Sequence, residues 1–338
     1  MKQFDPLKIK GKKFVVIGDF LLDRYRFMQP KKLSPEAPVV VFNPVSEEFR
    51  LGGAANVANN LSSLGGDVKF FSVPEDWKSY SESVPLSFAL HVYSGSRKIT
   101  IKERVLTRRQ QVCRIDVQED RRLDHEEAEE IRAAAGKAIE DCDIVVMSDY
   151  NQGFMDKNLV LGLVEKARKE NKMVVVDTKA PDSIEKYLSV TALVPSYAEA
   201  ELIVGQKYED DVYALSEKLL TESRAKCVGI TMGPKGIFVK ERLTQEELRR
   251  LDGPNATEGF FLYPYVWDEA EVIDVTGAGD TVLAATAAAL ACGESFVSAL
   301  DFANEAAGQV VRKVGVVPVD VEQLLDERRK DARDAKKS

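Results

Sequence analysis

Short apolar runs alternate with amphipathic stretches along most of this chain, and this alternation limits the possible folds more than any other feature. The runs that we interpret as strands are Phe14–Ile17, Val68–Val73, Ile144–Met147, Met173–Val176, Ala192–Val194, Val228–Thr231 and Ile237–Val239. Helical patterns fall between many of them. This rhythm predicts an α/β fold with a mainly parallel central sheet, helices on both of its faces, and ligands at the carboxyl ends of the strands.

Two segments break the rhythm. Pro38–Asn43 and Ile99–Asp116 have extended, alternating patterns, and neither is followed promptly by a helix. We interpret them as parts of a small β-sheet lid, with lid segments at about 24–50 and 95–117. Residues 1–320 are expected to form one large domain that carries this lid, and residues 321–338 a surface helix that frays into a tail.

Composition excludes several classes of protein. A chain of 338 residues with 44% hydrophobic content can bury a large core. A net charge of -8 and an isoelectric point near 5.2 argue against nucleic-acid binding, because neutralising phosphates needs a positive surface. The N-terminus lacks an apolar signal core, and the longest uncharged helix pattern, Val282 to Cys292, is too short to span a bilayer. We therefore expect a cytoplasmic protein without membrane association.

Cysteine and histidine are too sparse and scattered to supply a metal cluster, a disulfide framework or a histidine-based triad. The residues concerned are Cys113, Cys142, Cys227, Cys292, His91 and His125. Any acid–base chemistry must then rest on carboxylates.

The segment Asp274–Asp280 has the pattern of an anion cradle with a carboxylate base. Gly277, Ala278 and Gly279 can present backbone N–H groups at a helix N-terminus, where the free donors and the helix dipole favour negative charge. Asp280 would lie in the first turn, ready to accept a proton from an attacking hydroxyl. This combination predicts phosphoryl transfer.

This motif has other possible interpretations. A glycine turn that caps a buried, alanine-rich helix would give the same residues without chemistry. A dinucleotide fingerprint needs a glycine where Val282 stands, and the Gly-Lys-Ser/Thr of a Walker loop occurs nowhere in the chain.

A second group of polar residues suits sugar hydroxyls, which need both donors and acceptors. Asp19 follows a buried strand and Asp23 comes one short turn later, while Gly52 and Gly53 let the backbone approach a ligand ahead of Asn56. Taken singly, Asn56 could be a helix cap and Asp19 a turn residue. Their company with Asp280 favours the ligand-binding interpretation.

Two motifs carry a resemblance to a known family. With Gly52-Gly-Ala-Ala-Asn56 followed by Gly65, and with Asp274-Val-Thr-Gly-Ala-Gly-Asp280, the chain resembles the ribokinase-like (PfkB-type) carbohydrate kinases over nearly its whole length. The resemblance implies a ribokinase-like kinase domain over residues 1–320. It also implies that Asp280 is the base, that Gly277–Gly279 form the anion hole, and that Asp19, Asp23, Gly52, Gly53 and Asn56 bind the sugar.

The resemblance extends to the nucleotide. It implies ATP contacts for Thr231, Gly233, Gly236, Thr276 and Asn304. The family's Asn-x-x-Glu motif appears here as Ser196 to Glu199, so Glu199 is expected to act on Mg²⁺ through water, and the missing amide is expected to weaken activity or metal affinity. ATP and Mg²⁺ are the expected cofactors, and dependence on a monovalent cation is left open.

A closer resemblance is to the kinase domain of bacterial heptose enzymes that phosphorylate D-glycero-β-D-manno-heptose 7-phosphate at the anomeric oxygen. The stretches that carry it are Gly18–Tyr25, Ser34–Val39, Leu51–Gly65, Arg104–Gln111 with Arg114–Asp116, and Ser148–Gly153. A basic cluster on the predicted lid suits a sugar phosphate, although strand alternation turns about half of it to solvent. That cluster comprises Lys102, Arg104, Arg108, Arg109 and Arg114, and Asp149 is added as a substrate-binding candidate. Gln152 stands where these enzymes usually carry lysine.

The resulting hypothesis is an ATP-dependent sugar kinase that forms a homodimer through its lid and acts on a heptose 7-phosphate-type acceptor. Ribose, fructose phosphate and nucleoside acceptors stay open. No nucleotidyltransferase domain is expected in a chain of 338 residues. A non-catalytic sugar or nucleotide sensor on the same fold is the alternative that Ser196 and Gln152 motivate. A nicotinamide-dependent oxidoreductase is disfavoured, because no complete Gly-x-Gly-x-x-Gly occurs.

Overall fold

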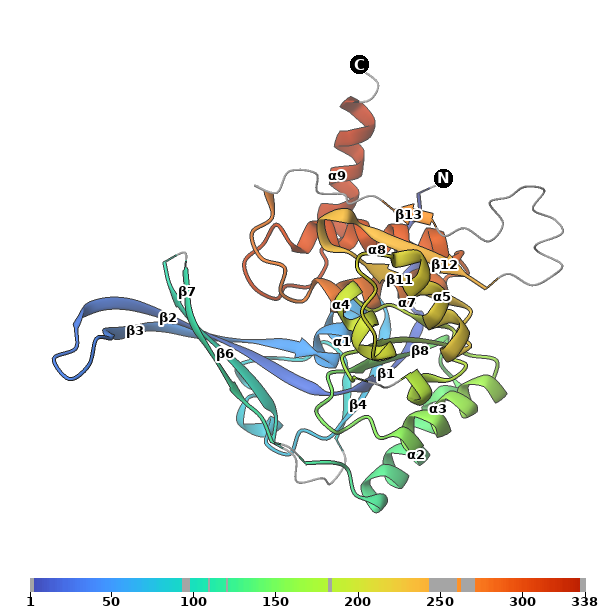
Figure 1. Ribbon diagram of the computed structural model, residues 1–338, viewed down its shortest axis with the longest axis horizontal. Helices are drawn as coiled ribbons and strands as arrows, with labels where there is room; N and C mark the ends of the chain where they lie inside the picture. Colours follow the sequence, from blue (N-terminus) through green and yellow to red (C-terminus); the bar gives the residue numbers. More distant parts are fainter. Residues whose placement is uncertain are drawn as a thin grey trace.

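The computed structural model describes residues 3–92, 98–108, 110–119, 121–181, 184–242, 260–262 and 271–334. Within these residues a nine-stranded sheet runs through the body of the molecule in the order β13-β12-β11-β10-β9-β8-β1-β4-β5 (Figure 1). Its strands are β1 (Lys13–Gly18), β4 (Asp67–Ser72), β5 (Ala89–Val92), β8 (Ile144–Asp149), β9 (Met173–Thr178), β10 (Ala192–Leu193), β11 (Cys227–Thr231), β12 (Ile237–Glu241) and β13 (Phe260–Leu262). All neighbours pair in parallel except β11–β12 and β12–β13. The predicted mainly parallel sheet is confirmed, and β5 and β13 are additions to it.

Alternate side chains of the sheet enter two separate cores. In β1, Phe14 and Val16 lie in one core, and Val15 and Ile17 lie in the other. The first core is covered by α1 (Ala54–Ser63), α7 (Ala278–Ala291) and α8 (Phe296–Val310), and the second by α2 (His125–Glu140), α3 (Lys157–Lys169), α4 (Tyr197–Val204) and α5 (Val212–Ser223). Strands buried on both faces explain the continuous apolar runs in the sequence.

Local sequence signals account for where several helices begin. Asp124 and Asp156 accept hydrogen bonds from the first-turn amides of α2 and α3, and Ser295 does the same for α8. Four short 3-10 helices, η1 (Pro6–Ile9), η2 (Trp77–Ser79), η3 (Ile184–Tyr187) and η4 (Gly233–Lys235), connect elements within the described residues.

The C-terminal helix α9 (Val321–Asp334) is attached to the body at its first turns. Leu324 is buried, and Arg328 pairs with Glu305 while donating to the carbonyl oxygen of Phe4 at 2.5 Å. This contact joins the two ends of the chain. The helix then extends away from the body, as Figure 1 shows.

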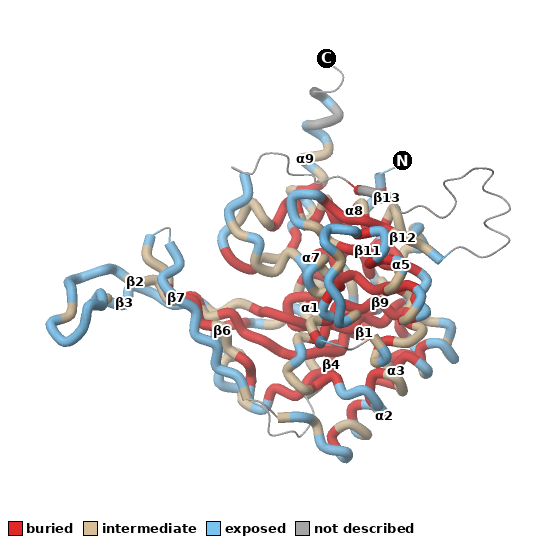
Figure 2. The backbone as a smooth tube through the Cα atoms, viewed as in Figure 1, coloured by how far each residue is buried: buried red, intermediate tan, exposed pale blue. Residues whose placement is uncertain are grey.

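The lid is a separate four-stranded sheet in the order β3-β2-β6-β7. Its described strands are β2 (Phe20–Leu33), β3 (Val40–Gly53), β6 (Thr100–Thr107) and β7 (Gln110–Val117). It projects from the body as an arm whose outer part is exposed on both faces (Figure 2). The predicted small β-sheet is confirmed, and its strands extend beyond the predicted segments. Asp23 lies within β2 rather than after a short turn, because β2 starts at Phe20, immediately after β1 and Asp19.

Candidate active site

The strand order brings the carboxyl ends of β1, β8 and β9 next to one another. Each strand is followed directly by a polar or charged residue: Asp19 after β1, Tyr150 after β8 and Lys179 after β9. The base of the lid and the N-terminus of α7 reach the same edge, since Tyr150 contacts both Lys102 of β6 and Asp280 of α7. Ligand sites of open parallel sheets lie at such an edge.

Asp280 lies in the first turn of α7 and is only 2% exposed. Asn56 Nδ2 donates to Asp280 Oδ2 at 3.0 Å, and the Tyr150 hydroxyl donates to Oδ1 at 2.8 Å. Burial raises the pKa of Asp280 to about 6, although the Lys179 charge and the bonds from Asn56 and Tyr150 oppose this rise. A carboxylate with a pKa near neutrality is suited to accept and release a proton.

The Asn56 amide is oriented by a chain of hydrogen bonds. Asn60 Nδ2 donates to Asn56 Oδ1 at 3.1 Å, and the backbone N–H of Val319 donates to Asn60 Oδ1 at 3.0 Å. Because the Asn56 oxygen accepts from Asn60, its nitrogen faces Asp280. Two motifs that lie 224 residues apart in sequence therefore meet at one carboxylate.

The glycine loop ahead of Asp280 is packed closely on one side and open on the other. A Cβ on Gly277 would lie 2.9 Å from Asn56 Nδ2, and this residue has a left-handed φ of 81°, so glycine is required. A Cβ on Gly279 would meet nothing within 4 Å. The Ala278 N–H donates to the Val275 carbonyl oxygen at 3.2 Å and is used within the turn. The open space at the helix N-terminus lies beside Gly279.

Asp274 fixes the shape of this loop. Its Oδ1 accepts from the backbone N–H and the hydroxyl of Thr276 at 2.9 and 2.6 Å, and its Oδ2 accepts from the Gly315 N–H at 2.9 Å. The Thr276 side chain is thus engaged within the loop. Arg50 of β3 donates to the Val314 carbonyl oxygen at 2.6 Å, which ties the base of the lid to the same region.

On the lid side, Asp19 and Asp23 lie close to Gly52 and Gly53. Asp19 Oδ2 accepts the Tyr150 N–H at 2.8 Å. A Cβ on Gly52 would lie 2.6 Å from Asp23 Oδ2, and Gly53 is the N-cap of α1 with a φ of 57°. Burial raises the pKa of Asp23 against the opposing charge of Arg104, with which it forms a buried ion pair.

The predicted basic cluster divides once its partners are known. Arg104 is neutralised by Asp23, and Arg114 pairs with Asp116 at 2.9 Å, half-exposed to solvent. Lys102 lies with its Nζ 4.8 Å from the centre of the Tyr150 ring, and burial lowers the pKa of its ammonium group. Among the residues that the structure describes, Lys102 makes no ion pair with a carboxylate.

The basic cluster has two further members, Arg108 and Arg109. Arg108 is exposed in the β6–β7 turn. Arg109 lies outside the described residues.

The carboxylate of Asp149 is turned to other partners. It accepts from the Tyr187 hydroxyl and from Lys186, and its Oδ1 accepts the Asn151 N–H at 2.8 Å. It is 1% exposed. The structure therefore does not bring its side chain together with Asp280 and Lys102, and its substrate contact stays a prediction.

The nucleotide-side candidates surround the start of α4. Ser196 is the N-cap of α4 and forms a capping box with Glu199, whose Oε2 accepts the Ser196 N–H at 2.8 Å. Glu199 Oε1 accepts from Lys179 Nζ at 2.7 Å. Although burial opposes ionisation, Lys179 and the bonds with Ser196 together lower the pKa of Glu199. The serine that replaces the family asparagine thus has a defined structural role.

Thr231 ends β11 and forms a bridge with Ser196, which places it beside the capping box. Gly233 and Gly236 have positive φ in the turn that follows, at η4. A Cβ on Gly233 would meet nothing within 4 Å. Asn304 is buried in α8.

Tyr150, Asp177 and Lys179 are site residues that the motif analysis missed. Lys179 Nζ lies 3.6 Å from Asp177 Oδ2 and 4.4 Å from the centre of the Tyr150 ring. Burial raises the pKa of Asp177 to about 7. Despite its own burial, Lys179 has a raised pKa, because acidic groups including Asp177 and Glu199 surround it. Their position at the carboxyl ends of strands was the available signal, since Asp177 follows the predicted strand Met173–Val176 and Tyr150 and Lys179 directly follow β8 and β9.

Within the described part of the chain, no group of three or more His, Cys, Asp or Glu side chains could hold a metal ion. The same residues contain no helix long and apolar enough to cross a membrane.

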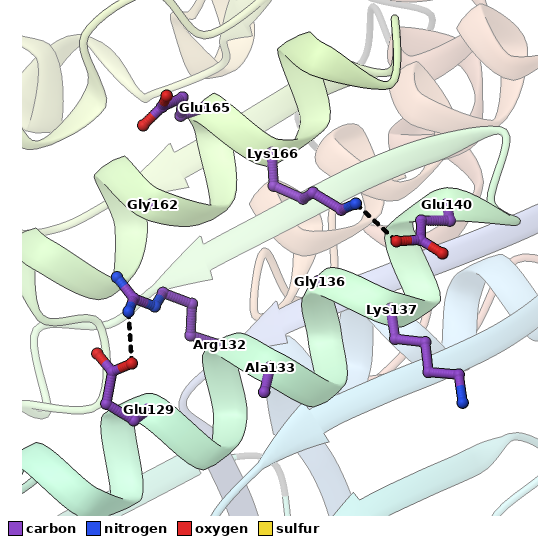
Figure 3. Close-up of a pocket in the computed structure, with 9 residues that line it drawn as sticks. All are labelled: Glu129, Arg132, Ala133, Gly136, Lys137, Glu140, Gly162, Glu165 and Lys166. Atoms are coloured by element: carbon purple, nitrogen blue, oxygen red, sulfur yellow. Dashed lines mark hydrogen bonds and ion pairs between the residues drawn. The ribbon is translucent and has the colours of Figure 1, made fainter.

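A groove of about 720 Å³ lies between α2 and α3, and Figure 3 shows the side chains that line it. Its charges largely satisfy one another, since Arg132 pairs with Glu129 and Lys166 pairs with Glu140. None of its lining residues belongs to the site at Asp280.

Comparisons with known proteins identify the family of this chain. Residues 12–323 match the model of the pfkB family carbohydrate kinases. The bifunctional protein HldE of Coxiella burnetii is 35% identical over 318 residues, which cover 92% of this chain and 62% of that protein. HldE of Campylobacter jejuni subsp. jejuni is 34% identical over 328 residues, with 94% and 65% covered. The chain thus spans less than two thirds of the length of these relatives.

Solved structures show the same fold. A crystal structure of phosphofructokinase-2 from Escherichia coli in complex with potassium has a TM-score of 0.72 at 17% identity, covering 94% of this chain and 97% of that one. Arabidopsis thaliana ribokinase complexed with ribose and ATP has a TM-score of 0.65 at 21% identity, with 93% and 99% covered. The ribokinase-like fold predicted from the two motifs is confirmed.

Proposed function

The chain belongs to the pfkB family of carbohydrate kinases, and on this premise we propose that it transfers the γ-phosphoryl group of ATP to the anomeric hydroxyl of a heptose 7-phosphate-type acceptor. The observation that carries the proposal is the buried Asp280 carboxylate, with a pKa of about 6, beside the open space at Gly279. A base and an anion-binding helix terminus are thus adjacent, as phosphoryl transfer requires.

In the proposed reaction the acceptor hydroxyl gives its proton to Asp280 as its oxygen attacks the γ-phosphorus. The bond between this phosphorus and the bridging oxygen breaks, and ADP leaves with the bond's electron pair. Asn56 and Tyr150 hold the two carboxylate oxygens of the base. The positive end of the α7 dipole and the loop Gly277–Gly279 lie where negative charge develops.

On the nucleotide side we assign the phosphates to the space beside Gly279, with Thr276 shaping the loop. Thr231, Gly233, Gly236 and Asn304 are the proposed contacts for the rest of the nucleotide. Magnesium, bound to the phosphates, would neutralise part of their charge. Glu199 would reach it through a water molecule, because its oxygens already accept bonds from Ser196 and Lys179.

On the acceptor side, Asp19, Asp23 and Asn56 are the proposed partners of the sugar hydroxyls. Lys102 is the proposed partner of the acceptor's phosphate, because it is a half-buried cation without a carboxylate in the described residues. The HldE relatives favour a heptose phosphate over other sugar phosphates.

The test is ADP release with ATP and Mg²⁺ against pairs of acceptors, each sugar with its phosphorylated form, including heptose 7-phosphate. Turnover that depends on a phosphorylated heptose supports the proposal. Turnover with ribose or a nucleoside alone would replace the acceptor, and ATP binding without turnover on any acceptor would overturn the kinase assignment. Exchange of potassium for sodium in the same assay tests for a monovalent cation.

The pH dependence of kcat/KM is expected to show an acid limb near pH 6. Asp280 must be ionised to accept a proton, and its pKa of about 6 means that activity is lost as pH falls through this value. The measurement is the initial rate at low acceptor concentration from pH 5 to 9. A rate that stays constant down to pH 5 would contradict the assignment of Asp280 as base.

We further propose that two chains pair through the lid. Apolar side chains are exposed along its strands, among them Leu33 (72%), Val45 (66%), Ile115 (49%) and Val117 (56%). Ile115→Lys is expected to convert a dimer to a monomer, as measured by light scattering after gel filtration, whereas Leu7→Lys, at an exposed apolar residue of the body, is expected to leave the mass unchanged. A monomeric wild type would refute the pairing.

A further inference from the structure

Tyr150 follows β8, and its hydroxyl bonds to Oδ1 of the candidate base Asp280, whereas Asn56 bonds to Oδ2. We propose that Tyr150 is a positioning residue for Asp280, whose phenolic hydroxyl holds the carboxylate ionised and in the orientation that receives the acceptor's proton. This inference rests on the proposed function. It assigns a role to a side chain that belongs to neither of the two family motifs.

The position of Tyr150 is fixed through its backbone. Its N–H donates to Asp19 Oδ2 at 2.8 Å, and its carbonyl oxygen accepts from Gln152 Nε2 at 3.1 Å. Asp19 directly follows β1, the strand next to β8 in the sheet. The residue is thus held by the sheet edge itself rather than by a free loop.

The ring of Tyr150 is held as well. Lys102 Nζ of the lid lies 4.8 Å from the ring centre, and Lys179 Nζ, just after β9, lies 4.4 Å from it. Ammonium groups over an aromatic ring are attracted to its face. Tyr150 therefore contacts Lys102, Lys179 and the proposed base Asp280 at the same time.

The protonation state of the Tyr150 phenol decides which group donates in its hydrogen bond with Asp280. Burial and the Asp280 charge raise the pKa of Tyr150 well above its usual value, so the hydroxyl keeps its proton and donates. Asp280 Oδ1 accepts from Tyr150 at 2.8 Å and Oδ2 accepts from Asn56 at 3.0 Å. With each oxygen bonded once, the plane of the carboxylate is fixed, and further lone pairs stay available to an acceptor hydroxyl.

The groups that face Asp280 come from five places: Asn56 of α1, Tyr150 after β8, Lys179 after β9, Asp177 within β9 and Asp23 of β2. Burial raises the pKa of Asp280 and Asp23 adds to this, while Lys179, Asn56 and Tyr150 lower it. Removing the Tyr150 hydroxyl removes one of the contributions that keep the base ionised, so the pKa of Asp280 should rise.

The test is Tyr150→Phe, which deletes the hydroxyl and keeps the ring that Lys102 and Lys179 contact. We expect the acid limb of kcat/KM to move up by about one pH unit, because a hydrogen bond to a charged group contributes about that much. The value of kcat/KM at pH 6 should then fall by about 5-fold and recover at pH 8.5, with KM for ATP unchanged. An acid limb at the wild-type position would overturn the proposal.

Tyr187→Phe is the matched control. It removes the same atom from another buried tyrosine, whose hydroxyl donates to Asp149 and makes no contact with Asp280. A loss of stability alone would be shared by both variants. The acid limb should stay in place in Tyr187→Phe, and a shift of equal size there would overturn a specific role for Tyr150.

A second measurement does not need turnover. The infrared carboxyl band of Asp280 is obtained as the difference between each protein and its Asp280→Asn counterpart, and it is followed against pH. A higher pH midpoint of this band in Tyr150→Phe supports the inference, whether or not any acceptor is turned over. If no acceptor is turned over, the proposed function fails while the inference about Tyr150 stands. Turnover in the wild type, with neither the band nor the acid limb moved by Tyr150→Phe, overturns the inference and leaves the proposed function standing.

Discussion

Asp280→Asn is expected to lower kcat by about 10³-fold or more while leaving ATP binding intact, because the amide cannot accept the proton of the acceptor hydroxyl. Asparagine has nearly the same shape as aspartate, and its side-chain oxygen can still accept a hydrogen bond in a pocket where Asn56 and Tyr150 are donors. The rate is measured with saturating acceptor at pH 8, and ATP binding by titration calorimetry. A kcat within tenfold of wild type would show that Asp280 is not the base.

The same substitution is expected to stabilise the fold at neutral pH. The pKa of Asp280 is raised from 3.8 to about 6 in the folded chain, so its contribution to stability is present below pH 4 and is lost as pH rises through 6. An uncharged side chain avoids this loss, by about 1–3 kcal/mol at pH 7. Thermal melts at pH 4 and pH 7.5 should show the variant gaining on wild type only at the higher pH.

Asp320→Asn is the matched control for both effects. Asp320 is exposed ahead of α9, and its Oδ1 accepts the Gln323 N–H at 3.0 Å, a bond that an asparagine oxygen can also accept. Neither kcat nor the melting temperature is expected to change. If Asp280→Asn raised the melting temperature without lowering kcat, this carboxylate would be buried but would have no role in catalysis.

How far the sequence predicts the site depends on whether chemistry lies within a motif or between strands. Asp280 and Asn56 each stand in a motif with its own glycines, and both were predicted although they are far apart in sequence. Tyr150 and Lys179 each follow one strand, and only the order β9-β8-β1 brings them together. Sheet order follows from packing across the whole chain, which no local pattern contains.

The charged residues of the lid show the same limit of prediction from the sequence. Strand alternation predicts that Lys102 and Arg104, two residues apart, share one face. It does not tell which of them is neutralised, because that depends on Asp23 in the neighbouring strand β2. Among the described residues, pairing across strands joins Arg104 to Asp23 and leaves Lys102 without an ion pair, whereas substrate contact by either residue stays a prediction.

The length of β2 and β3 was also beyond the sequence patterns. Both run for 14 residues, and their outer parts are largely exposed, so the alternating pattern of Pro38–Asn43 does not continue along the whole length of either strand. Register shifts between Phe27 and Met28, and between Pro30 and Lys32, accommodate the proline. An exposed two-stranded arm needs no buried face, and the usual signal of a strand is therefore missing.

Lys102→Met is expected to raise KM for a phosphorylated acceptor by about 100-fold while leaving an unphosphorylated acceptor unaffected, because a half-buried cation that meets a phosphate contributes several kcal/mol. The methionine keeps the length and apolar stem of the side chain beside Tyr150. Since burial lowers the pKa of Lys102, its removal is not expected to destabilise the fold. The measurement is kcat and KM for one sugar with and without its phosphate.

Lys32→Met serves as the control, since Lys32 is an exposed lysine in the outer part of the same lid, on β2. Its acceptor KM values should match wild type. Equal losses for both acceptors in Lys102→Met would mean that this lysine positions Tyr150 and the base rather than the phosphate. A loss confined to the phosphorylated acceptor would instead make Lys102 the determinant of substrate class, because the neighbouring Arg104 is already paired with Asp23.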